Sequence, residues 1–68
     1  MVDKLEFYYH VKKAGLTTEE VANKLDISLQ SLYLRVNGKR DFKLKELRIL
    51  YDILKLDTVE KQQAVFFA

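Results

Sequence analysis

The segment from Thr17 to Gly38, TTEEVANKLDISLQSLYLRVNG, constrains the fold of this chain more than any other part of the sequence. Thr17 followed by Glu20 has the spacing of a capping box, which begins a helix. The apolar residues that follow fall along one side of such a helix. They are Val21, Ala22 and Leu25. The spacing predicts an amphipathic helix that starts at Thr17.

A second helix is predicted directly after a three-residue turn. Ile27 is the apolar residue of that turn, so we expect it to insert into the core, and Ser28 can cap the next helix. Leu32 and Val36 are four residues apart and face inward on this helix. Gly38 suits the position just beyond the helix end. The segment is therefore predicted to form a helix, a tight turn and a second helix.

The spacing of the capping and apolar residues in this segment resembles the helix-turn-helix of the lambda-repressor/Cro-like family of DNA-binding regulators. The resemblance depends on a small residue, Ala22, where the two helices cross, and on the pair Asn37-Gly38 at the end of the second helix. It also depends on apolar residues at Val21, Leu25, Ile27 and Leu32. It continues through NGKRDFKLKEL, covers most of the chain, and is closest to small phage-type repressors with a short apolar tail.

The chain departs from the pattern of that family in three ways, at four positions. Thr18 stands where Gln is usual, and Asp26 stands where Gly is usual. If the turn requires a positive φ angle, Asp tolerates it better than most residues, with some strain. Leu29 and Leu34 occupy base-reading positions at which polar residues are commoner.

The remaining chain predicts a single all-α domain over residues 1–68, a compact five-helix bundle with the helix-turn-helix at its second and third helices. A first helix is expected from about Val2 to Lys13 and a fourth from about Leu44 to Lys55. A fifth, capped by Asp57, should run to about Phe66. Leu44, Leu47, Leu50 and Leu54 have helical spacing and are expected to face inward. The predicted core includes Val21, Ala22, Leu25, Ile27, Leu32, Val36, Leu47 and Leu50.

Composition supports a small helical protein without disulfides. The chain has 68 residues with no Pro, no Cys and two Gly, both at predicted helix ends. No apolar run approaches the ~20 residues that span a membrane. We therefore expect a cytoplasmic protein that makes no membrane contact. The only histidine, His10, has no second ligand nearby, so no metal site is expected. No catalytic set, cofactor or small-molecule effector is expected either.

Positive charge is concentrated in one part of the sequence. Residues 28–48 contain six basic and two acidic residues, a net charge of +4, whereas the whole chain carries +2. Taken alone, this distribution is more typical of a solvated helix face followed by a polar loop than of a binding surface. Beside a helix-turn-helix it indicates a surface that binds phosphates.

The resemblance implies that the second helix of the motif enters the DNA major groove. Gln30 is then the best candidate for direct base contact, because its amide can pair with adenine. The expected base-contacting residues are Ser28, Leu29, Gln30, Tyr33 and Leu34. The expected phosphate contacts are Thr18, Ser31, Asn37, Lys39, Arg40 and Lys43.

Several alternatives remain open from the sequence. Leu29 could belong to the edge of the core, and Tyr33 could be an ordinary surface residue. Together with Leu34 they could instead form an apolar strip that binds a protein, as in an antirepressor or regulatory adaptor. The apolar tail could pack within the chain. Alternatively, it could form the seam of a homodimer that assembles at least when the protein is bound to DNA. The tentative seam consists of Ile49, Ile53, Phe66 and Phe67.

Overall fold

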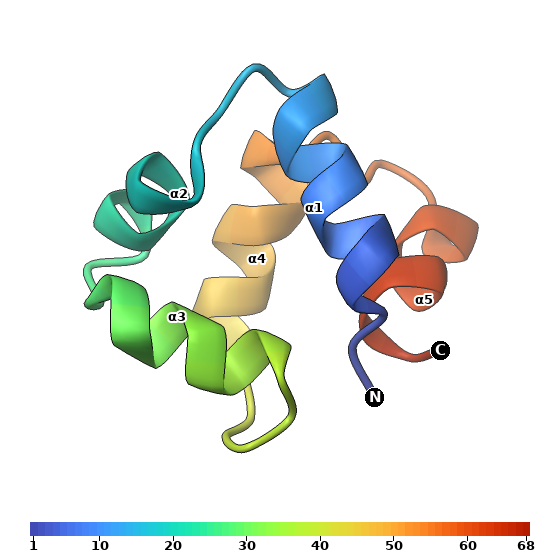
Figure 1. Cartoon of the computed structure of the whole chain (residues 1–68). Helices are drawn as coiled ribbons and strands as arrows, with labels where there is room; N and C mark the ends of the chain where they lie inside the picture. The colour runs from blue at the N-terminus through green and yellow to red at the C-terminus, as the bar shows by residue number, and fades with distance from the viewer.

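A computed structural model describes all 68 residues as five α-helices and no strands (Figure 1). The predicted all-α five-helix fold is confirmed. The helices are α1 (Lys4–Lys13), α2 (Thr18–Lys24), α3 (Leu29–Val36), α4 (Leu44–Ile53) and α5 (Val59–Phe66). None of them is long and apolar enough to cross a membrane.

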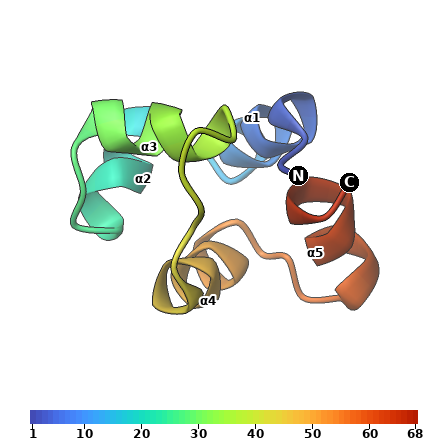
Figure 2. The same ribbon diagram turned by 90° about the horizontal axis from the view of Figure 1, so that it is seen from below.

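The two chain termini lie side by side next to α1 and α5 (Figures 1 and 2). Two backbone hydrogen bonds join them: Asp3 N–H donates to the Val65 carbonyl at 2.7 Å, and Ala68 N–H donates to the Met1 carbonyl at 3.1 Å. On the other side of the molecule α2 and α3 pack together, with α4 across the core from α3 (Figure 2). The terminal segments thus close the bundle away from the α2–α3 pair.

The core is one apolar cluster to which every helix contributes. Its aromatic part consists of Phe7 and Phe66, together with the half-buried Phe42. The ring of Phe42 is stacked on Phe7 at 6.4 Å and meets Phe66 edge-on at 5.5 Å, both measured between ring centroids. The buried apolar residues are Phe7, Val11, Val21, Ala22, Leu25, Leu32, Val36, Leu50, Leu54, Leu56, Val65 and Phe66. Of the predicted core, only Ile27 and Leu47 are partly exposed, and both still pack against the cluster.

Four of the helices end in the same way, with one residue in the left-handed conformation. Gly15 and Gly38 have φ angles of 75° and 78°, as the sequence predicted for helix-ending glycines. Asp26 and Lys55 take the same role without being glycine, with φ angles of 57° and 55°. At each end, the N–H of the residue that follows donates a hydrogen bond to a carbonyl of the last turns of the helix. Lys39 N–H, for example, donates to the Leu34 carbonyl at 2.9 Å. The strain expected at Asp26 is therefore present, and Lys55 carries it too.

Two of the predicted helix starts, those of α1 and α5, needed correction, whereas α4 begins at Leu44 as predicted. Asp3, whose side chain accepts from Glu6 N–H at 3.1 Å, caps α1, so α1 begins at Lys4 and not at Val2. Thr58, not Asp57, caps α5 through a hydrogen bond from Lys61 N–H at 3.2 Å. At the start of α4 the cap is Lys43, whose side chain makes no capping bond.

Two predictions about which side chains face the core were wrong. Leu44, the first residue of α4, is 65% exposed, whereas Leu50 and Leu54 are buried and Leu47 is partly buried against the core. Phe66, expected in a dimer seam, is 5% exposed and packs on Phe7 and Phe42, so it belongs to the core. Ile49 and Ile53 are partly buried against the same cluster. Of the tentative seam, only Phe67 is largely exposed, at 61%.

Candidate functional site

The outward face of α3 and the loop that follows it form the candidate site. Leu32 and Val36 hold the inner side of α3 in the core, and this leaves Gln30 and Tyr33 exposed. The turn before α3 is held from α2, since Ile27 N–H donates to the Ala22 carbonyl at 3.1 Å. Hydrogen bonding and core packing thus fix which face of α3 points to solvent.

At the start of α3 two serines bond to each other. Ser28 Oγ accepts from Ser31 N–H at 3.0 Å and donates to Ser31 Oγ at 2.9 Å. The predicted cap at Ser28 is confirmed. Because Ser28 uses its hydroxyl hydrogen in this bond, Ser31 is the serine whose hydroxyl can donate to another molecule.

The three apolar or aromatic residues of the candidate surface differ in exposure. Leu29 is half-buried and packs against the core. It therefore lies at the edge of the core, which was one of the alternatives that the sequence left open. Leu34 is also half-buried, but it is not part of that cluster. Tyr33 is 40% exposed. Solvent therefore reaches Leu34 and Tyr33 at the middle of α3.

Tyr8 of α1 is close enough to Tyr33 for the charge of one phenol to affect the other. Partial burial raises the pKa of Tyr8 above its usual value, and the charge of the neighbouring Tyr33 adds to the rise. The ring of Tyr8 is fixed edge-on against Phe7, with centroids 5.5 Å apart. The sequence pattern did not predict this electrostatic interaction, because it depends on how α1 and α3 are arranged in space.

The cations of the loop are all available to a ligand. Lys39, Arg40 and Lys43 are exposed, and none of them takes part in the three ion pairs of the structure. Those pairs join His10 to Glu6, Arg35 to Glu46, and Lys61 to Asp57. Asn37 is exposed at the end of α3, and Thr18 is partly exposed at the start of α2. The predicted phosphate-contacting residues of the loop are thus free of intramolecular partners.

Arg35 and Glu46 form a buried ion pair beneath this surface. Arg35 Nε lies 3.0 Å from Glu46 Oε1, and the two residues are 9% and 2% exposed. Arg35 is one of the six basic residues of segment 28–48, and its burial means that it does not belong to the surface charge expected there. One signal was present: Arg35 falls between Leu32 and Val36 on the inner side of the helix. Because the pair is neutral overall, its burial leaves the net charge of residues 28–48 unchanged.

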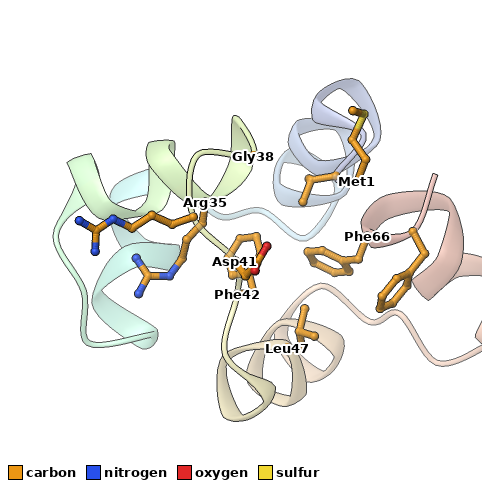
Figure 3. A pocket seen from close by; sticks show the side chains of 10 residues that line it. Met1, Arg35, Gly38, Asp41, Phe42, Leu47 and Phe66 are labelled. Atoms are coloured by element: carbon orange, nitrogen blue, oxygen red, sulfur yellow. The ribbon is translucent and has the colours of Figure 1, made fainter.

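A pocket of about 430 Å³ lies beside the loop, between residues 38–42 and the two termini (Figure 3). Most of its lining is apolar, and Phe42, Leu47 and Phe66 contribute to it. In Figure 3 the Arg35 guanidinium lies on the far side of the loop from Phe66. The pocket is nevertheless partly polar, because Arg35, Arg40 and Asp41 also line it.

Comparison of the chain with protein-family models, curated proteins and solved structures gives no match. The resemblance to the lambda-repressor/Cro-like family stays a prediction, and function has to be argued from the site itself.

Proposed function

We propose that this protein is a sequence-specific DNA-binding transcriptional regulator, in which α2, the turn and α3 act as a helix-turn-helix. The observation that carries the proposal is the position of three exposed, unpaired cations, Lys39, Arg40 and Lys43, in the loop next to the outward face of α3. A helix flanked by free cations suits a duplex, because the helix fits the major groove while the cations reach phosphates.

Base contacts would come from the exposed middle of α3. Gln30 can donate to and accept from adenine in the major groove, and Leu34 can pack on a thymine methyl group. Tyr33 can lie along the groove wall or donate to a phosphate. Leu29 would contribute less than its sequence position implies, because part of its side chain packs on the core.

Phosphate contacts would come from both ends of α3. Lys39, Arg40 and Lys43 would contact one stretch of backbone, and Ser31 with Thr18 would contact the backbone at the other end. Asn37 is exposed between them. Such contacts set the register of the protein on DNA and supply most of the salt-dependent affinity.

A second protomer on the same DNA would double this surface. Two copies bound about 34 Å apart would recognise a palindromic site. With Phe66 in the core, the residues left for contact between copies are Phe67 and the partly exposed Ile49 and Ile53. Sedimentation of the protein with and without DNA tests this: one protomer on one half-site at every concentration would contradict it.

The proposal is tested by titrating the protein into random DNA fragments over a salt series and then selecting a preferred site. Three phosphate contacts predict a slope of about −3 in log affinity against log salt. The competing function is a protein-binding module that uses Tyr33 and Leu34. In that case no salt-dependent DNA binding is expected, and Leu34→Ala should abolish a protein complex.

A further inference from the structure

A continuous set of hydrogen bonds runs under α3 from its first residues to the start of α4. It begins with the bonds between Ser28 and Ser31, and continues where Arg35 Nη1 donates to the Ser31 carbonyl at 3.2 Å. Arg35 Nε then donates to Glu46 Oε1 at 3.0 Å. The same oxygen accepts from Lys43 N–H at 2.9 Å. One carboxylate oxygen therefore joins α3 to the residue that caps α4.

Stability alone is a weak reason for a chain to bury such a pair. Removing two charges from water costs several kcal/mol per ion, and well-packed apolar residues in the same place are often equally stable or better. Arg35 and Glu46 are nevertheless among the most buried polar residues of this 68-residue chain. The pair does provide defined geometry, because the planar guanidinium donates in two fixed directions, to Ser31 and to Glu46.

Both ends of this set of bonds coincide with the proposed phosphate contacts. Ser31 lies at the start of α3, and Lys43 lies at the end of the basic loop. We propose that Arg35 and Glu46 are positioning residues, which fix the loop and the start of α4 relative to α3 so that both ends contact the DNA backbone together. This inference rests on the proposed function, since it concerns how the same surface is assembled. Binding is tighter when contact groups are ordered beforehand.

Two variants separate positioning from stability. The double variant Arg35→Met/Glu46→Leu keeps the net charge and fills the site with apolar side chains, but it removes every bond between α3 and the cap of α4. Glu46→Gln keeps an oxygen that can accept from both Arg35 and Lys43, while it leaves the buried guanidinium without a counter-charge. Asp57→Leu/Lys61→Met is the matched control, because it also keeps the net charge but removes an exposed ion pair, Lys61 Nζ to Asp57 Oδ1 at 3.1 Å, at the start of α5.

The expected results run in opposite directions. The apolar double variant should melt no lower than the unaltered protein, yet bind the selected DNA site about tenfold more weakly, the scale expected when one long side chain must be ordered on binding. Glu46→Gln should melt lower but, below its melting temperature, keep its preference for the selected site over random DNA. The Asp57→Leu/Lys61→Met control should lose neither, because an exposed ion pair contributes little to stability. If affinity simply follows melting temperature across these proteins, or if the double variant binds DNA normally, the inference is overturned.

Hydrogen exchange in the free protein gives a readout that needs no DNA. Lys39 N–H and Arg40 N–H both donate to the Leu34 carbonyl, at 2.9 and 3.3 Å. Their exchange should be faster in the apolar double variant and unchanged in Glu46→Gln at matched stability. Unchanged exchange in the double variant would contradict the positioning role. If the unaltered protein binds no DNA at any salt concentration, the proposed function fails, and exchange alone decides whether the pair fixes the loop.

Discussion

At the scale of single residues, the ends of α2 and α4 contain the clearest local strain. Asp26 and Lys55 adopt positive φ angles that glycine adopts without a steric penalty. Each closes its helix with a bond from the following residue, such as Leu56 N–H to the Tyr51 carbonyl at 2.8 Å. The backbone therefore requires this conformation whatever side chain is present.

Lys55→Gly should raise the free energy of unfolding by ~0.5–1 kcal/mol, because relief of the left-handed strain exceeds the extra entropy of glycine in the unfolded chain. Asp26→Gly should give a smaller gain, since Asp tolerates this region better. Urea denaturation measures both. Gly38→Ala is the matched control and should lower stability by more than ~1 kcal/mol. A Lys55→Gly protein no more stable than the parent would contradict the assigned strain.

Substitutions of Gln30 and Arg40, two residues of the candidate surface, should have different effects on DNA binding. Gln30→Ala should cost ~1–3 kcal/mol on the selected site and relax preference at one base pair, with non-specific binding almost unchanged. Arg40→Ala should weaken binding to every sequence and reduce the salt slope by ~1. Fluorescence titrations against selected and random duplexes at several salt concentrations measure both quantities. Equal effects of the two substitutions on both duplexes would contradict the division of roles.

At the scale of helices, α2 and α3 depend on a close crossing at Ala22, which is 2% exposed. Ala22→Leu should destabilise or unfold the protein, because overpacking typically costs ~1–3 kcal/mol and a domain of this size has little to lose. Circular dichroism during thermal melting measures the effect. Ala64→Leu on the exposed side of α5 is the control and should be nearly neutral. A soluble, fully helical Ala22→Leu protein with unchanged melting would contradict the crossing.

The start of α4 should show a conflict between stability and binding. Lys43 occupies the cap position with extended φ and ψ angles of −75° and 155°, but it makes no side-chain capping bond. Lys43→Ser should add one from Glu46 N–H and raise stability by ~1 kcal/mol. It should also weaken DNA binding at all sequences, because a phosphate contact is lost. Urea denaturation and DNA titration of the same variant measure both; a gain in stability with unchanged DNA affinity would show that Lys43 contacts no phosphate.

At the scale of the whole molecule, the sequence predicted what local rules decide. The capping box at Thr17 and Glu20, with both hydrogen bonds present, and the glycine that ends α3 depend only on neighbouring residues. The Arg35–Glu46 pair and the burial of Phe66 depend on how helices meet, which spacing does not specify. The residues of α3 that face solvent could be predicted from the spacing of its buried residues. The proximity of Tyr8 of α1 to Tyr33 could not be predicted in this way.

The most direct test of the central claim is an NMR titration of the selected DNA site into the labelled protein, mapped residue by residue. If α3 and the loop after it bind the duplex, the largest amide shifts fall on Gln30, Tyr33, Lys39 and Arg40. Exposed residues of α5 such as Glu60 should then show only small shifts. Shifts confined to α1 and α5, or no shift with any DNA at low salt, would contradict this claim.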